Sequence, residues 1–240
     1  MARDGRRHVF AGGGFLPFLG VPPIVAAMLA ETGRPDPTLC LVPTGDETDL
    51  RWLDATERTL RSSTATVCDL RLFPAPNVAD PTDRLRSADA IFVGGGSTAN
   101  MLAVWRAHGL DDVLRDAWTA GTVVGGVSAG AMCWFEASLT DSFGPALHPL
   151  SDGLGIVGGS FCPHFDRNPR RPRYRETVGD GSLPAGVACE DGVTVHFADD
   201  ELVEVLAERR ASRAWHLERG ADGDVVETPL DDVPTGRSNP

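Results

Sequence analysis

The feature that most restricts the fold of this sequence is a regular alternation of short apolar runs with helix-forming segments. The apolar runs predict strands at His8–Ala11, Leu39–Val42, Ala65–Leu70, Ala90–Val93 and Val123–Val127. Helical patterns lie between them at Pro23–Glu31, Glu47–Arg61, Thr98–His108 and Leu110–Thr119. Strands that alternate with helices pair in parallel, and the helices then cover both faces of the sheet. The first half of the chain therefore predicts a three-layer, doubly wound α/β fold with a mostly parallel sheet.

The second half of the chain has a different pattern, in which short strands follow one another closely. Strands are predicted at Gly155–Phe161, Val187–Cys189, Val193–Phe197, Leu202–Leu206, Ala214–Leu217 and Val225–Val226. The last two flank a turn containing Asp222-Gly223, which is typical of a β-hairpin. The polar residues 232–240 are expected to form a flexible tail. No linker is evident, so we expect residues 1–240 to form a single α/β domain.

The charge composition opposes several classes of function. The 34 acidic and 22 basic residues leave a net charge of -12, which disfavours binding to nucleic acid or to an anionic membrane. The chain contains no Lys, so a Ser–Lys dyad, a Schiff base and a phosphate-loop lysine are all impossible. An enzyme with this sequence must use a His or a carboxylate as its base, or a metal ion.

Neither a metal nor a cofactor is expected from the sequence. The five cysteines are scattered and lack the close pairs of a zinc site: Cys40, Cys68, Cys133, Cys162 and Cys189. The pattern H-E-x-x-H is also absent from the sequence. The charged amino terminus lacks the apolar core of a signal peptide, and the apolar stretch Leu19–Ala30 is short and contains two prolines. We therefore expect a cytoplasmic protein with free thiols.

The segment Gly126-Val127-Ser128-Ala129-Gly130 carries the most information about function. It contains the pattern G-x-S-x-G, preceded by an apolar strand and followed by a helix-forming run, Ala131–Glu136. A serine at such a sharp turn has an exposed hydroxyl, and only small neighbours avoid a clash. The N–H of Ala129 and the start of the helix favour an oxyanion there. The pattern predicts Ser128 as a nucleophile, although a tight turn with an idle hydroxyl has the same local sequence.

A second glycine-rich turn, Gly94-Gly95-Gly96-Ser97, follows the strand Ala90–Val93. Such turns gather at the carboxyl edge of a parallel sheet, so this turn is expected to approach Ser128 and to supply a second N–H donor. The competing hypothesis is a phosphate or dinucleotide site, here or at Gly12–Gly14. Neither stretch has the sequence G-x-G-x-x-G, which disfavours that hypothesis.

The position of His164 makes it the favoured candidate, among six histidines, for a general base. The apolar run Ile156–Phe161 ends just before it, so the imidazole is expected at the exit of a strand, where catalytic loops gather. The spacing leaves the acid that orients this base open. Four carboxylates are plausible: Asp141, Asp166, Glu190 and Asp191.

The chain carries three motifs in a fixed order: GGGST at Gly94–Thr98, GVSAGA at Gly126–Ala131 and PHFD at Pro163–Asp166. Together they resemble the peptidase E (aspartyl dipeptidase) and cyanophycinase family of serine peptidases, across roughly His8–Asp200. The resemblance implies a fold like that of the class I glutamine amidotransferases, which is flavodoxin-like. It also implies hydrolysis of small peptides through an acyl-enzyme, with Asp-X dipeptides as a candidate substrate.

The resemblance also implies roles for individual residues. Ser128 matches the family nucleophile, His164 the general base and Glu190 the acid of a Ser-His-Glu triad. Asp141 matches a carboxylate that supports activity in peptidase E. The implied oxyanion donors are backbone N–H groups, those of Ala129 and of Gly95 or Gly96.

The segment 167–175 departs from the family pattern. Peptidase E has at this point a loop with an Arg that binds the substrate aspartate, whereas this segment carries five arginines and differs in length and character. Arg171 and Arg173 are the candidates for binding an acidic group of the substrate, because an Arg fork suits a carboxylate. The alternative is a solvated cationic loop that pairs with nearby acids.

Two other functions stay open from the sequence. One is an amidase or cyanophycinase-like hydrolase of another substrate, and the other is a non-catalytic, ligand-binding amidotransferase-like domain. A true glutamine amidotransferase would carry Cys at the elbow, where this chain has Ser128. The presence of a serine, a histidine and an acid at matching positions disfavours the non-catalytic domain. The chain is compatible with a monomer or a homodimer.

Overall fold

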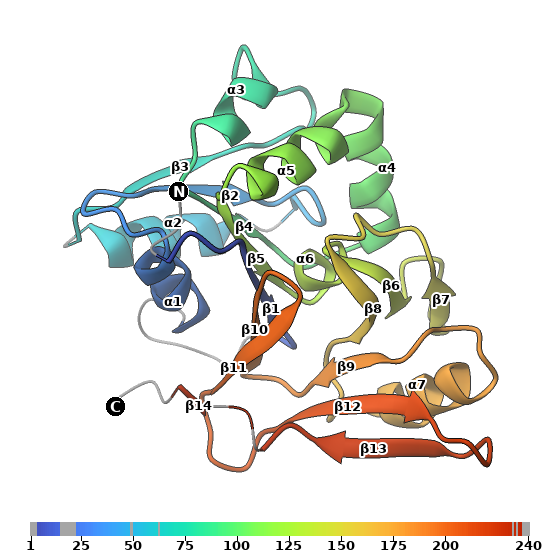
Figure 1. Ribbon diagram of the computed structural model, residues 1–240. Helices are drawn as coiled ribbons and strands as arrows, with labels where there is room; N and C mark the ends of the chain where they lie inside the picture. The colour runs from blue at the N-terminus through green and yellow to red at the C-terminus, as the bar shows by residue number, and fades with distance from the viewer. Residues whose placement is uncertain are drawn as a thin grey trace.

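The computed structural model describes residues 4–14, 23–48, 50–61, 63–231, 233 and 235–236, which form two sheets (Figure 1). The larger sheet contains β1 (His8–Gly12), β2 (Thr38–Val42), β3 (Thr66–Asp69), β4 (Ala90–Val93), β5 (Val123–Val127), β10 (Val193–Ala198), β11 (Glu201–Ala207) and β14 (Thr235–Gly236). The smaller sheet contains β6 (Phe135–Thr140), β7 (His148–Leu150), β8 (Val157–Cys162), β9 (Gly186–Cys189), β12 (Ala214–Arg219) and β13 (Val225–Pro229). The helices are α1 (Pro23–Glu31), α2 (Arg51–Leu60), α3 (Pro81–Arg86), α4 (Thr98–His108), α5 (Leu110–Thr119), α6 (Ala129–Met132) and α7 (Arg170–Gly179).

The larger sheet has the strand order β14-β11-β10-β1-β5-β4-β2-β3. The last five strands in this order, β1, β5, β4, β2 and β3, run parallel. Neighbouring residues of each strand alternate between its two faces. On β1, Phe10 packs with the apolar residues of α1 and α2, whereas Val9 packs with those of α3, α4 and α5. Helices therefore cover both faces, and this confirms the predicted three-layer α/β fold.

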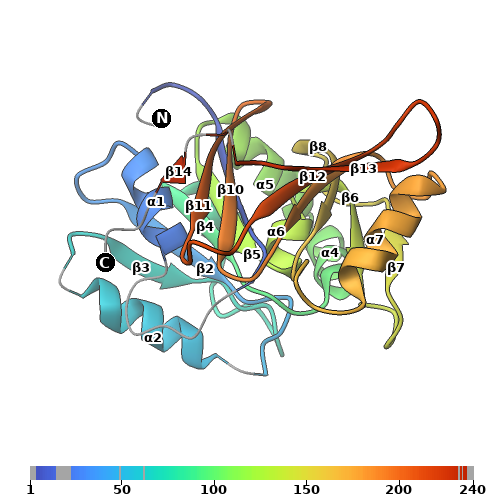
Figure 2. The ribbon, with the colours of Figure 1, turned by 90° about the horizontal axis from the view of Figure 1, so that it is seen from below.

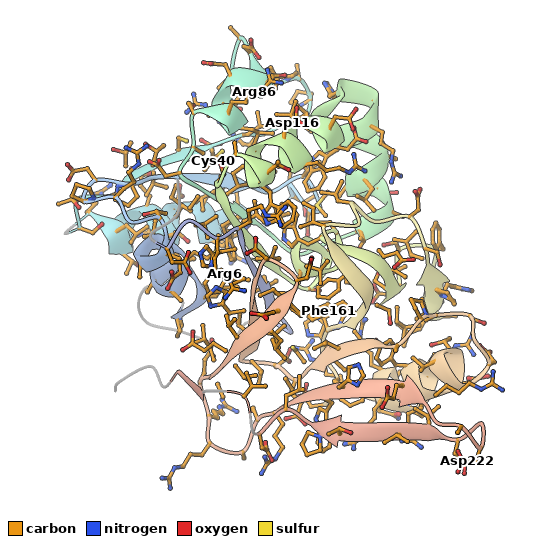
Figure 3. All side chains as sticks on the ribbon, in the orientation of Figure 1. Arg6, Cys40, Arg86, Asp116, Phe161 and Asp222 are labelled. Carbon is orange, nitrogen blue, oxygen red and sulfur yellow. The ribbon has the colours of Figure 1, made fainter. Side chains whose placement is uncertain are left out.

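The smaller sheet has the order β13-β12-β9-β8-β6-β7, in which β6, β8 and β9 run parallel. Its helix α7 buries Tyr174 and Val178 against it. Figures 1 and 2 show α7 with this sheet at one end of the molecule and α2 beside β3 at the other. Phe135 joins the two sheets, because its ring stacks on Phe161 of β8 (labelled in Figure 3) at 4.8 Å and meets Phe197 of β10 edge-on.

Three local differences from the sequence-based expectations have physical causes. The expected helical run Ala131–Glu136 is wrong beyond α6, because Phe135 is buried as the first residue of β6. The helix expected from Glu47 begins only at Arg51, and the Glu47 carboxylate instead accepts backbone hydrogen bonds from Leu72 and Phe73. The arginine-rich segment expected as a loop contains the helix α7.

The carboxyl-terminal region contains the predicted hairpin. Strands β12 and β13 pair in antiparallel fashion around a turn in which Gly223 has a φ of 91°. Of the predicted tail, residues 232, 234 and 237–240 lie outside the described residues, and β14 pairs with β11. Within the described ranges, no helix is both long and apolar enough to cross a membrane.

Candidate active site

Ser128 stands at a sharp turn between β5 and α6. Its backbone has φ 54° and ψ -118°, a region that non-glycine residues rarely adopt. The glycines on either side of this turn, Gly126 and Gly130, are required because the backbone of β4 lies too close for a side chain. A Cβ on Gly126 or on Gly130 would lie closer than 3.0 Å to the carbonyl oxygen of Val93. The structure thus has the sharp strand-to-helix turn that the sequence predicts, with Ser128 in a strained conformation.

His164 reaches the serine from the smaller sheet. Its Nε2 lies 2.9 Å from Ser128 Oγ, within hydrogen-bond distance. The residue follows β8, as expected, and its own φ of 53° turns the ring back toward the larger sheet. Its backbone N–H donates to the carbonyl of Gly13, next to the end of β1.

Asp191 is the acid that the structure brings to this histidine. Its Oδ1 lies 2.5 Å from His164 Nδ1, and Arg167 Nε donates to its other oxygen at 2.6 Å. The backbone N–H of Asp191 donates to Asp166 Oδ1 at 3.0 Å. A hydrogen-bonded chain therefore runs from Arg167 through Asp191 and His164 to Ser128.

Glu190, the acid implied by the resemblance, points elsewhere. Its carboxylate accepts hydrogen bonds from the backbone N–H of Arg213 at 3.0 Å and from Trp215 Nε1 at 3.4 Å. The structure therefore places Asp191, and not Glu190, beside the imidazole. Asp191 lies in the turn after β9, which the hydrogen bond from the Val193 N–H to the Glu190 carbonyl closes, and there the two adjacent carboxylates point to different partners.

Gly13 and Gly14 make room for this arrangement. A Cβ on Gly14 would lie 2.6 Å from His164 Cε1 and even closer to Asp191 Oδ1. A Cβ on Gly13 would collide with the carbonyl oxygens of Cys189 and Glu190. The glycine run after β1, which the sequence left open as a phosphate site, therefore forms the contact between the nucleophile's sheet and the base.

The expected oxyanion donors lie beside the nucleophile. A Cβ built on Gly95 would lie 3.6 Å from Ser128 Cβ, so this turn approaches the serine as predicted. Ala129 is the first residue of α6, where backbone N–H groups lack helical partners. Among the residues that the structure describes, no backbone acceptor pairs with the N–H of Gly95, Gly96 or Ala129.

The surroundings of His164 favour its neutral form. Burial lowers its pKa below the usual value, and the charges of Arg167 and Arg170 act in the same direction. The Asp191 carboxylate opposes this shift. A neutral imidazole whose Nδ1–H donates to Asp191 presents the lone pair of Nε2 to the serine hydroxyl.

The arginines of the segment 167–175 divide into two groups. Arg171 pairs with Glu227 and lies over the Trp215 ring, and Arg173 pairs with Glu176. Both arginines proposed to bind substrate therefore have partners within the protein. None of these partners is Ser128, His164 or Asp191.

Arg167 and Arg170 lie closer to the site. Arg170 is 8% exposed and donates to Asp141 Oδ2 at 3.0 Å and to the carbonyl of Leu139 at 3.1 Å. Arg167, which the sequence analysis did not single out, bonds Asp191 and has a side chain that is 59% exposed. In the sequence, the only signal for Arg167 was its position three residues after His164. In the structure, a turn links the two residues, because the Arg167 N–H donates to the His164 carbonyl.

Comparison with known proteins identifies the family of the chain. Residues 11–205 match the sequence model of Peptidase family S51. The chain belongs to this family. It is a serine-type peptidase, and its substrate therefore contains a peptide bond. Among the residues described, no cluster of three or more His, Cys, Asp or Glu side chains is arranged to hold a metal ion.

Relatives of this S51 peptidase include an uncharacterized peptidase, YgaJ, of Bacillus subtilis, which is 36% identical over 204 residues, or 85% of this chain and 87% of that protein. A peptidase E of Streptomyces coelicolor is 33% identical over 115 residues, 44% of this chain and 47% of that protein. Two solved structures share the fold. A peptidase from an acI-B1 actinobacterium has a TM-score of 0.72 at 14% identity, covering 96% of this chain and 95% of its own. A peptidase E-like protein from Listeria monocytogenes has a TM-score of 0.60 at 19% identity, covering 95% and 100%.

Proposed function

We propose that this S51 peptidase hydrolyses small peptides through an acyl-enzyme on Ser128, with His164 as general base and Asp191 as the acid that orients it. The observation that supports this proposal is the continuous chain of hydrogen bonds, 2.9 Å from Ser128 Oγ to His164 Nε2 and 2.5 Å from Nδ1 to Asp191 Oδ1. A nucleophile bonded to a base that a third group orients is the arrangement that activates a weak serine.

In the first half of the reaction, His164 Nε2 takes the proton of Ser128 as Oγ attacks the peptide carbonyl carbon. The tetrahedral oxyanion accepts hydrogen bonds from the N–H groups of Ala129 and of Gly95 or Gly96. The intermediate collapses when the imidazolium gives its proton to the leaving amine. A water molecule, deprotonated by the same imidazole, then hydrolyses the acyl-enzyme.

Asp191 has two roles in this scheme. It accepts the Nδ1–H bond, which fixes the tautomer in which Nε2 faces the serine, and its negative charge stabilises the imidazolium that forms. Arg167 holds the second carboxylate oxygen, so the carboxylate cannot rotate away from the ring. The acid of the triad is thus itself positioned by a charged partner.

The substrate that we propose is a short peptide with an acidic group close to the scissile bond, and Asp-X dipeptides are the first candidates. The resemblance of the motifs to the peptidase E family supports this choice. Arg167 supports it as well, because its side chain is 59% exposed and lies directly beside the triad. A carboxylate of the substrate there would meet a cation already held in place.

The test is hydrolysis of a dipeptide panel led by Asp-X and including β-linked Asp-Arg, with the wild type, Ser128→Ala and Arg167→Gln. We expect selective Asp-X cleavage that Ser128→Ala abolishes. Cleavage of β-linked Asp-Arg alone would favour the cyanophycinase-like alternative. If no peptide is cleaved, a serine-directed phosphonate separates the remaining cases. Labelling of Ser128 would keep the nucleophile and reject the substrate, whereas no labelling would reject both.

A further inference from the structure

Two of the five cysteines lie side by side in the larger sheet. Cys40 of β2 and Cys68 of β3 are register partners in a parallel ladder, so their side chains point to the same face of the sheet. Adjacent strands are about 4.8 Å apart, which lies within the roughly 4.4–6.8 Å range of Cα separations that a disulfide spans. At this separation each thiol affects the ionisation of the other.

The two thiols differ in access to solvent. Cys40, labelled in Figure 3, is completely buried on the face of the sheet that α3, α4 and α5 cover. Cys68 is half-buried, because β3 is the last strand of the sheet. A small solute can therefore approach Cys68, while Cys40 lies behind it.

Arg84 of α3 gives Cys68 a cationic neighbour. Its positive charge favours the ionised form of the Cys68 sulfur, and no carboxylate in the described part of the chain forms an ion pair with Arg84. The neighbouring Cys40 thiol and Arg84 together lower the pKa of Cys68 to about 6, although burial and Asp69 oppose them. These neighbours favour the Cys68 thiolate, which is the reactive form of the thiol.

We propose that Cys68 is a peroxide-reactive thiol and that Cys40 resolves its oxidation product into a disulfide between β2 and β3. In the first step, the Cys68 thiolate attacks one oxygen of a hydroperoxide, the O–O bond breaks, and the other oxygen leaves as hydroxide or alkoxide and takes a proton. This step gives a sulfenic acid on Cys68. In the second step, the Cys40 sulfur loses its proton and attacks the Cys68 sulfur, and the sulfenic oxygen leaves as water. Overall, the two thiols are oxidised and the peroxide is reduced.

The other three cysteines provide an internal control. Cys133, Cys162 and Cys189 are completely buried, and burial raises their pKa values, that of Cys162 to about 12. Neutral, inaccessible thiols react slowly with peroxide. The reaction is therefore expected at one pair among five free thiols. This site is independent of the peptidase centre, since β3 is three places from β5 in the order of the larger sheet.

The test is treatment of the folded, reduced protein with hydrogen peroxide, followed by thiol counting, intact mass and peptide mapping. The wild type should pass from five free thiols to three, lose the mass of two hydrogen atoms and yield a Cys40–Cys68 linked peptide. Cys40→Ser should accumulate a sulfenic acid on Cys68 that dimedone traps. Cys68→Ser should keep its four remaining thiols under the same treatment.

Arg84→Gln tests the cause of the reactivity without removing either thiol. It should slow the second-order reaction with peroxide by about tenfold at pH 7, because the pKa of Cys68 rises. Circular dichroism identifies any variant that is unfolded, and the wild-type result is decisive without the variants. Retention of all five thiols, or oxidation first at Cys133, Cys162 or Cys189, would overturn the proposal. A sulfenic acid on wild-type Cys68 without a disulfide would overturn the role of Cys40.

Discussion

The two sheets contribute unequally and in different ways to the proposed active site. The larger sheet supplies the nucleophile and the turns around it, each at the carboxyl end of a buried parallel strand. The smaller sheet supplies the base, His164, after β8, and Asp191 lies on the connection from β9 back to β10. The nucleophile elbow is a local structure of one sheet, whereas the catalytic group as a whole exists only when both sheets are docked.

A short backbone contact also connects the end of β1 with the loops that carry His164 and Asp191. Gly13 donates to the carbonyl of Val193 and accepts from the N–H of His164, and Gly14 accepts from Gly192. These bonds fix the separation between the end of β1 and the loops that bear the base and the acid. The larger sheet therefore determines where the serine stands, and the glycine contact determines whether the imidazole reaches it.

The largest effect is expected from breaking that contact. Gly14→Ala places a methyl group 2.6 Å from His164 Cε1 and closer still to Asp191, so the base must move away from Ser128. Peptidase activity should fall by about a thousandfold, because a misplaced base no longer shares a hydrogen bond with the nucleophile. The measurement is kcat/KM on the peptide that the wild type cleaves best. Gly158→Ala is the matched control, since a Cβ there meets nothing within 4 Å.

The larger sheet also contains a pH-sensitive pair that is separate from the site. His196 of β10 is 5% exposed and bonds His8 of β1 at 2.8 Å. Burial, with a smaller effect from the charge of His8, lowers the pKa of His196 to about 4. The unfolded chain, with a pKa near 6.5, therefore binds this proton first as the pH falls, so stability is full above pH 6.5 and is lost between 6.5 and 4.

Replacing that histidine should flatten the pH dependence of stability. The lowered pKa corresponds to about 3 kcal/mol of unfolding free energy lost on acidification. Denaturant unfolding of wild type and His196→Gln at pH 7 and pH 4 measures this difference. The pKa of His164 is lowered too, but it contributes equally to both proteins and cancels in the comparison. An equal loss of stability in the two proteins would contradict the assignment.

A smaller effect is expected from Arg167, which links the acid to the loop after the base. Arg167→Gln removes a charge that lowers the pKa of His164, so that pKa should rise. The acidic limb of the activity profile should then move to higher pH, and kcat should fall by about tenfold because Asp191 loses a bonded partner. Arg173→Gln, whose partner is Glu176, should change neither quantity. If kcat falls in Arg167→Gln but the acidic limb of the pH profile stays at the same pH, the role of Arg167 is purely structural.

The larger sheet could be predicted from the sequence almost completely. Parallel strands buried on both faces are continuous apolar runs, so all five from β1 to β5 were located. Ser128 could be predicted for a related reason, since an elbow depends only on its neighbours, Gly126 and Gly130. Sequence patterns report such local requirements directly.

The smaller sheet and its catalytic residues were harder to predict, because their roles depend on docking. Phe135 lies within a run predicted to be helical, yet it is the first residue of β6, where its ring stacks on Phe161. Glu190 and Asp191 are adjacent and chemically alike, and only the position of the second sheet determines which of them meets His164. Local sequence contains no signal for that choice.

The most direct test of the central claim compares Asp191→Asn with Glu190→Gln in the rate at which a serine-directed phosphonate labels Ser128 at pH 7. An amide at position 191 favours the wrong imidazole tautomer, so labelling should slow by about a thousandfold or more, whereas Glu190→Gln should stay within about threefold of the wild type. Rapid labelling of Asp191→Asn together with a large loss in Glu190→Gln would contradict the account. That result would identify Glu190 as the acid of the triad.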